Sequence, residues 1–169
     1  MMFIFLFFIG CMHMGIGMHG KMRMGSVISI QEVQQVNKND KMDQVIGKVV
    51  DNLINQPIHV TNIAVWRIHS QSAGLDIDLL RAKLTTYLVS MNTFQVINRE
   101  RLDALLQEQE LSLSGMINEN NAIEIGNLIG IDGFIDGYAS FNDNQLSLTL
   151  HLVETKTGKI VWSKTGQSE

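Results

Sequence analysis

The chain has 169 residues, 45% of them hydrophobic and 18% charged, which suits a single domain with a sizeable core. Its net charge of −4 is unevenly distributed, because residues 42–169 carry nine Lys or Arg against fifteen Asp or Glu, a net of −6. Nucleic-acid affinity depends on neutralising phosphates, so an acidic domain argues against a nucleic-acid partner. Cys11 is the single cysteine, which excludes an intrachain disulfide.

The N-terminus carries a candidate targeting signal. Its first ten residues, MMFIFLFFIG, form an apolar run that stops at Cys11. Ten residues are too few to cross a bilayer, which takes about 20, but they match the apolar core of a secretory signal peptide. Phe8-Ile9-Gly10-Cys11 resembles the lipobox of bacterial lipoproteins, in which the cysteine is lipidated and becomes the new N-terminus. We expect residues 1–10 to be a signal peptide and Cys11 to carry the lipid. The alternative is an apolar N-terminus with an unmodified cysteine.

Residues 11–40 show no clear hydrophobic period, so we expect a flexible, lipid-anchored tether ahead of a domain at 41–169. The tether holds thioether and imidazole side chains, at His13, Met14, Met18, His19, Met22 and Met24. Such ligands suit copper(I), but the glycines between them fix no geometry. A tether is therefore the preferred interpretation over a metal site.

Hydrophobic periodicity predicts the elements of the domain in chain order. We expect helices at 40–54, 76–91, 99–109 and 122–129, and strands at 58–68, 94–97, 132–141, 146–154 and 159–165. Asp40, Asp76 and Asn98 are the expected helix caps. Helices lie between the first strands along the chain, whereas the last three strands are joined by hairpin turns. This order predicts an α+β fold. Its mixed sheet has about five strands and ends in an antiparallel meander, with helices packed against it.

The charged stretch from Val96 to Gly115, VINRERLDALLQEQELSLSG, is the first candidate for an active site. On a helix, Leu102, Leu105 and Leu106 share one face, so the charged residues point toward solvent. The sequence lacks the motifs of zinc proteases, of serine hydrolases and of phosphate-binding loops. His59, His69 and His151 lie on or near different strands, where surface or packed side chains are the ordinary interpretation. We therefore expect no enzyme, no cofactor and no metal.

Three spaced segments resemble one family. NRERLDALLQEQELSLSG is followed by NAIEIGNLIGIDGFIDGYAS and then by LSLTLHLVETKTGKIVWS. Together they are similar to the envelope lipoprotein superfamily of CsgG, HfaB and LpoB. The matching positions are Asn98, Arg99, Leu102, Glu108, Gln109, Ser114, Gly115, Gly126, Gly130, Asp132, Gly137, Val153, Thr157, Gly158 and Ile160. Glycines such as Gly130 and Gly158 specify turns rather than chemistry, which fits a family that does not catalyse reactions.

The resemblance implies one of two roles. The curli channel carries a membrane-spanning hairpin between two strands that are joined here by only residues 142–145, so this chain resembles the compact LpoB type. That type implies a lipid-anchored protein on the periplasmic face of the cell envelope, at the outer membrane, that activates a peptidoglycan synthase (a penicillin-binding protein) by direct contact. The tether at 12–40 spans about 100 Å at its limit and nearer 30 Å as a coil, which favours work close to the anchoring membrane. The alternative is an accessory or ring-forming subunit of a curli-type secretion or surface-assembly complex, without transmembrane hairpins of its own.

Candidate partner-binding residues come from the aromatic side chains, because interfaces favour Trp and Tyr. Trp66, Tyr87, Tyr138 and Trp162 are the candidates, although each is more often a core residue. Trp162 is expected on an edge strand, so it is the one candidate interface residue. We expect an envelope protein as partner, and homo-oligomers are a further option.

Overall fold

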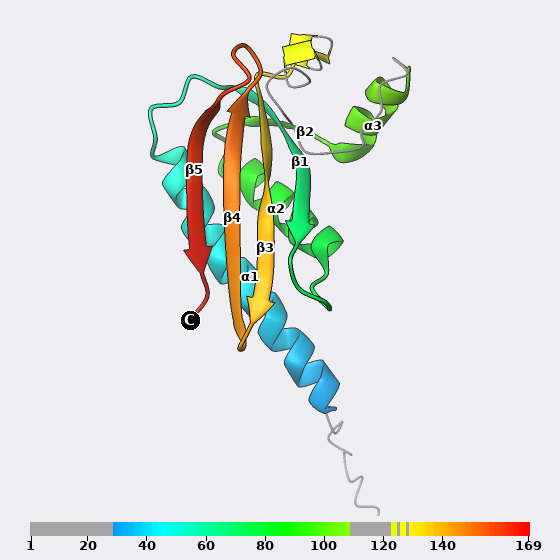
Figure 1. The fold of residues 1–169 in the computed structure, drawn as a ribbon, viewed down its shortest axis with the longest axis vertical. Coiled ribbons are helices and arrows are strands. Elements are labelled where there is room, and N and C mark those ends of the chain that lie inside the picture. Colours follow the sequence, from blue (N-terminus) through cyan, green and yellow to red (C-terminus); the bar gives the residue numbers. More distant parts are fainter. Residues whose placement is uncertain (1–28, 109–122, 125, 128) are drawn as a thin grey trace, which may run out of the picture.

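The computed structural model describes residues 29–108, 123, 124, 126, 127 and 129–169. Its elements are α1 (Ile30–Ile54), β1 (Asn62–Ser70), α2 (Ile77–Ser90), β2 (Gln95–Ile97), α3 (Arg99–Glu108), β3 (Gly133–Asn142), β4 (Gln145–Glu154) and β5 (Ile160–Gln167). The strands form one sheet in the order β2-β1-β3-β4-β5 (Figure 1). β1 runs parallel to both β2 and β3, whereas β3, β4 and β5 form an antiparallel meander. The predicted α+β fold with a mixed five-stranded sheet is confirmed.

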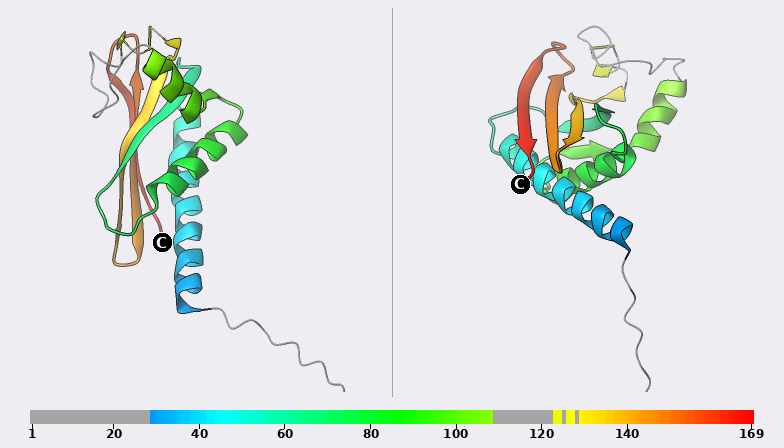
Figure 2. Two further views of the ribbon diagram at one scale, coloured as in Figure 1. Left: turned by 90° about the vertical axis from the view of Figure 1, so that its right-hand side faces the viewer. Right: turned by 60° about the horizontal axis from the view of Figure 1, so that its bottom comes forward.

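Helix α1 begins ten residues earlier than predicted. Ser29 is its N-cap, in a capping box in which Ser29 and Glu32 satisfy each other's backbone N–H groups. Asp40, the expected cap, therefore lies inside the helix, and residues 30–40 belong to α1 rather than to a coil. The first buried residue of α1 is Met42, so the helix contributes to the core only from there. Its N-terminal half extends beyond the sheet (Figures 1 and 2).

The other helix caps match their predictions. Asp76 accepts a hydrogen bond from the Leu79 N–H at 2.9 Å, and Asn98 accepts one from the Arg101 N–H at 2.8 Å. The first strand differs, because β1 starts at Asn62 rather than at residue 58. The carboxylate of Asp132 accepts hydrogen bonds from the backbone and side chain of Asn62 at 2.9 and 3.1 Å, which fixes the beginning of the strand.

One face of the sheet is covered by α1 and α2 (Figure 2). The strand β4 shows the alternation most clearly, since its leucines point to the helices while the residues between them point away. Each of these leucines is fully buried: Leu146, Leu148, Leu150 and Leu152. They join apolar side chains of α1, α2 and β1 in the main core. This face therefore supplies most of the apolar burial that stabilises the domain.

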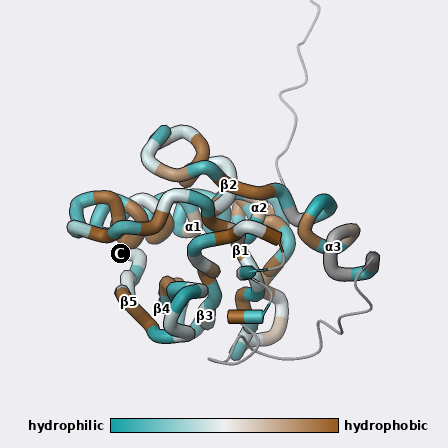
Figure 3. The backbone as a smooth tube through the Cα atoms, turned by 90° about the horizontal axis from the view of Figure 1, so that it is seen from above, coloured by the Kyte–Doolittle hydropathy of each residue, from teal (hydrophilic) through white to brown (hydrophobic). Residues whose placement is uncertain are grey.

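The described residues cover only part of the opposite face. α3 lies beside β1, as the view from above shows (Figure 3). A second, smaller core forms there from Ala64, Trp66, Leu102, Ile131, Phe134 and Val153. On this face, none of the labelled helices covers β4 or β5 (Figure 3). Polar side chains of these strands therefore gather on it.

A tight turn joins β3 to β4. Asp143 and Asn144 are the two residues between the strands, with φ of 47° and 60°, which suits a two-residue hairpin turn. No hairpin is inserted at this position, as the sequence predicted. No helix in the described ranges is long and apolar enough to cross a membrane.

Candidate interaction surface

A polar cluster occupies the middle of the less covered sheet face. It consists of His69 on β1, Asp136 and Tyr138 on β3, and His151 on β4. Asp136 is the register partner of His151, and Tyr138 is the register partner of His69. The Tyr138 ring stacks on His69 with a centroid separation of 5.6 Å and meets the edge of His151 at 6.4 Å. Three adjacent strands thus bring four polar or aromatic side chains into one patch, which we call the His–Asp patch.

Asp136 is the most buried polar residue of the His–Asp patch, with 8% of its surface exposed. Burial raises the pKa of its carboxyl group above the ordinary value, because the charged form loses hydration. His151, and then His69, act in the opposite direction by favouring the carboxylate. A buried carboxyl between two imidazoles is costly to maintain, which marks it as a candidate functional group.

Two imidazole nitrogens of the patch also lack partners. His69 Nε2 and His151 Nδ1 are buried and form no hydrogen bond within the described part of the chain. Buried polar atoms are normally paired, so unpaired ones call for an explanation. No three His, Cys, Asp or Glu side chains among the described residues are arranged to hold a metal ion.

The sequence interpretation did not find the His–Asp patch. It treated His69 and His151 as separate residues because they lie on strands that are far apart in the sequence. The alternation of β4, which placed His151 opposite the leucines, was a usable signal. The sequence does not reveal that β3 pairs with both β1 and β4. This pairing places Asp136 and Tyr138 between the two histidines.

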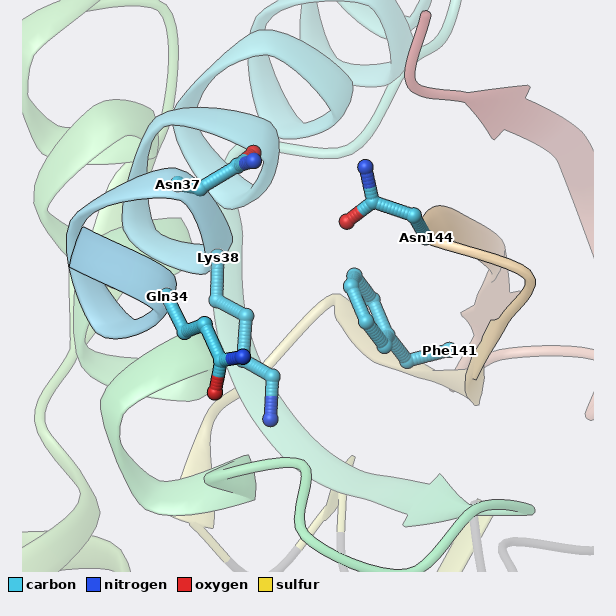
Figure 4. Close-up of a pocket in the computed structure, with 5 residues that line it drawn as sticks. All are labelled: Gln34, Asn37, Lys38, Phe141 and Asn144. Carbon is cyan, nitrogen blue, oxygen red and sulfur yellow. The ribbon is translucent and has the colours of Figure 1, made fainter. Parts of the chain in front are cut away.

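A second polar feature lies where the extended part of α1 passes the β3–β4 turn. The recess is lined by Gln34, Asn37, Lys38, Phe141 and Asn144 (Figure 4). Lys38 Nζ sits 5.3 Å from the centre of the Phe141 ring and donates a hydrogen bond to the Gly74 carbonyl at 3.3 Å. These contacts satisfy the lysine within the chain, so the recess is a structural junction between α1 and the hairpin.

Several predicted motif residues have structural roles. Leu102 is fully buried in the smaller core. A Cβ on Gly126 would lie 2.2 Å from Thr155 Cβ, and one on Gly137 would lie 2.0 Å from the Thr149 carbonyl oxygen. Only glycine therefore fits at these two strand and helix contacts. The motif spacing in this part of the chain reflects close backbone packing.

The remaining described motif residues shape turns. Gly130 and Gly158 adopt φ of 69° and 71°, in the left-handed region that favours glycine. Thr157 Oγ1 donates to Glu154 Oε2 at 2.8 Å and accepts from the Lys159 N–H at 3.3 Å, which closes the β4–β5 turn. These positions specify the hairpin, as the sequence predicted for Thr157 and Gly158.

Trp162, the candidate interface residue, does not present its side chain at the surface of this structure. Its side chain lies on the covered face of the sheet, with only 7% of the residue exposed, and Nε1 donates to Asn52 Oδ1 at 3.1 Å. β5 is an edge strand, as expected, but its tryptophan points at α1. Trp66 is also buried, whereas Tyr87 and Tyr138 are half-buried.

Some predicted positions lie outside the described residues. These are Cys11, Gln109, Ser114, Gly115 and the Met and His residues of the tether, together with the side chains of Arg99 and Glu108. Their roles stay predictions.

Comparison with known proteins defines the class. A family model described as the curli production assembly/transport component CsgG matches residues 55–145, more than half of the chain. The chain therefore belongs to the CsgG family. No curated protein sequence matches it.

Solved structures share the fold. The LpoB C-terminal domain from Salmonella enterica aligns with a TM-score of 0.60 and 21% identity, covering 78% of this chain and 98% of that one. The same domain from Escherichia coli aligns with a TM-score of 0.60, 20% identity and the same coverage. Lipoprotein GNA1162 from Neisseria meningitidis aligns with a TM-score of 0.50 and 14% identity, covering 65% and 81%. At these identities the likeness concerns the fold.

Proposed function

We propose that this protein is a lipid-anchored component of the bacterial cell envelope that acts by protein–protein contact and catalyses no reaction. In particular, we propose that it activates a peptidoglycan synthase from the periplasmic face. The observation that carries the proposal is the architecture: a CsgG-family domain with the compact LpoB-like fold and a two-residue β3–β4 turn. A candidate lipobox that ends at Cys11 agrees with it.

The contact surface that we assign is the His–Asp patch. Its two half-buried histidines and the half-buried Tyr138 bring imidazole and phenol groups together on the less covered face. A docked protein would contact these side chains and would also remove the patch from water.

The length of the anchor segment limits where this contact takes place. Residues 12–28 span at most about 60 Å when fully extended. Residues 30–41 add only about 18 Å, because they are helical and rise about 1.5 Å per residue. The reach is therefore shorter than a fully extended 12–40 segment would give. This favours a partner, or a partner domain, close to the membrane that holds the lipid.

A second candidate function follows from the matching family model, whose description concerns curli assembly and transport. In this case the protein would be an accessory or ring-forming subunit of a secretion or surface-assembly complex. The short β3–β4 turn supports an accessory role over that of a subunit with membrane-spanning hairpins at this position.

In-cell crosslinking followed by purification in detergent and mass spectrometry separates these functions. Recovery of a peptidoglycan synthase, followed by faster glycan-strand synthesis when the purified proteins are combined, is the expected result. Ordered multimers of this chain with secretion components would overturn the activator proposal and favour assembly. The double variant His69→Ala, His151→Ala should lose the crosslink, whereas Lys83→Ala, on the opposite side at α2, is the matched control that should retain it.

The same sample tests the anchor. The expected N-terminal peptide begins at a lipidated Cys11, and Cys11→Ala should release the protein from the membrane fraction. An N-terminal peptide that begins at an unprocessed Met1 would contradict lipid anchoring while leaving the crosslinking result to be judged on its own.

A further inference from the structure

The outer edge of β5 has unpaired backbone groups. Leu146 accepts a hydrogen bond from the Ser168 N–H at 2.9 Å, which makes these two residues a hydrogen-bonded pair at the end of β4–β5. Hydrogen-bonded and non-hydrogen-bonded pairs alternate along antiparallel strands. The register therefore places the N–H and C=O groups of Trp162, Lys164 and Gly166 toward β4, opposite Leu152, Leu150 and Leu148. Those of Ser163 and Thr165 point away from the sheet.

These outward groups are free in the structure. The hydrogen bonds between β4 and β5 use the backbone of the alternate residues. Within the described residues, no other hydrogen bond uses the backbone of Ser163 or Thr165. Both residues are exposed, and so are Ile160 and Val161 at the start of the strand, at 59% and 43%. An exposed row of N–H and C=O groups beside aliphatic side chains is the arrangement that accepts an added strand.

The charge of this edge differs from that of the whole domain. Lys156, Lys159 and Lys164 are exposed and form no ion pair with any described residue. The acidic residues nearest in the sequence are Glu154, which accepts the Thr157 hydroxyl, and Glu169, which pairs with Lys48. Residues 42–169 carry a net charge of −6, so a local row of three lysines stands out against an acidic background. The edge therefore favours an acidic ligand.

A second copy of the chain fits this edge poorly. If two β5 edges paired antiparallel about Ser163 or Thr165, the two Lys164 side chains would lie two positions apart on one face. Such diagonal neighbours are about 7–8 Å apart, so their charges repel. The irregular register between Leu152 and Val153 further disturbs a flat edge near Val161. Lysines and bulges are ordinary devices against self-pairing, and they leave the edge open to a strand of opposite charge.

We propose that the β5 edge binds an extended acidic segment of a partner protein as a sixth strand. Backbone groups of Ser163 and Thr165 would hold the segment. Its aliphatic residues would contact Ile160 and Val161, while its carboxylates would pair with Lys159 and Lys164. This docking site lies apart from the His–Asp patch and depends neither on lipid anchoring nor on the identity of the enzyme.

The test uses the full chain, labelled with ¹⁵N and kept in detergent, and two synthetic eight-residue peptides. One alternates valine with glutamate and the other alternates valine with lysine. The glutamate peptide should shift the amide signals of Ser163 and Thr165 and slow their hydrogen exchange, while the Trp162 and Lys164 amides are already protected. The lysine peptide should bind about tenfold more weakly, since two or three exposed ion pairs contribute this much together.

Two variants sharpen the test. Thr165→Pro removes an outward N–H without removing a bond to β4, so the fold should persist while peptide binding is lost; Thr165→Val is the matched control that should bind normally. Lys159→Glu combined with Lys164→Glu should reverse the preference between the two peptides. Equal binding of both peptides, or normal binding to a folded Thr165→Pro, would overturn the proposal. A concentration-dependent dimer that Thr165→Pro abolishes would overturn it in favour of a second copy.

Discussion

The two faces of the sheet are built from alternate residues of the same strands, yet they differ in every physical respect. On β4, Leu148 and Leu150 face α1 and are fully buried, whereas Thr149 and His151 face the other way and are half-buried. The leucine face is dry and closed by two helices. The other face carries a buried carboxyl group and two imidazoles with unpaired atoms. One strand can thus stabilise the fold with one set of side chains and offer binding groups with the other.

The largest effect is expected on the leucine face. Leu150→Ala should lower the free energy of unfolding by about 2–5 kcal/mol, because it removes buried apolar contacts and leaves a cavity. Urea denaturation followed by circular dichroism measures the loss. Thr149→Ala, the adjacent residue on the opposite face, should cost less than about 1 kcal/mol, since it removes the exposed hydrogen bond between Thr149 and Thr165 hydroxyls. Equal losses would contradict the contrast between the faces.

A smaller loss is expected where two backbones approach each other. In Gly137→Ala the new Cβ would lie 2.0 Å from the Thr149 carbonyl oxygen, so β3 and β4 must move apart. We expect a loss of roughly 1–3 kcal/mol, as for other overpacked sites, and a lower midpoint of thermal unfolding. A variant as stable as the parent would show that the strands do not approach this closely.

Trp162→Phe tests whether the Trp162 side chain of β5 has a structural role under α1 rather than a role in binding. The phenyl ring keeps the apolar contact with α1 but loses the hydrogen bond from Nε1 to Asn52, so we expect a loss of about 1 kcal/mol. Because the side chain is buried under α1, the same variant should leave partner crosslinking and peptide binding unchanged. A specific loss of binding in a variant of normal stability would restore Trp162 as an interface residue.

The smallest effect has the opposite sign. Burial raises the pKa of Asp136 above its value in the unfolded chain, so the ionised carboxyl destabilises the folded state. Relative to its stability at low pH, where the carboxyl is protonated, the folded protein loses stability as pH rises from the unfolded pKa, near 4, through the raised folded pKa. Asp136→Asn should therefore be more stable than the parent at pH 7, by less than about 1 kcal/mol because the amide is itself polar.

Urea denaturation of both proteins across pH 4 to 8 measures this difference. The advantage of Asp136→Asn should shrink as pH falls through the raised pKa and vanish near pH 4. A parent protein that is the more stable of the two at pH 7 would mean that the histidines outweigh burial. Loss of crosslinking in the variant would in addition support the His–Asp patch as the contact surface.

Local signals were enough to predict most of the helices and strands and the class of fold. Local signals act within a few residues, so Asp76 and Asn98 could be identified as caps, and the leucines of β4 as core residues. The same reasoning placed the turns at Asp143 and Gly158. It failed for the start of α1, where two signals competed: the hydrophobic period begins only at Met42, whereas the capping box at Ser29 starts the helix earlier.

Which polar residues lie together depends on strand pairing between distant segments of the chain. His69 and His151 become neighbours of Asp136 because β3 inserts between β1 and β4, a pairing between segments remote in the sequence. The direction of Trp162 and the outward groups of Ser163 likewise follow from the β4–β5 register, which a shift of one residue would reverse. Alternation along a strand is a local property, but the choice of strand neighbours is a property of the whole chain.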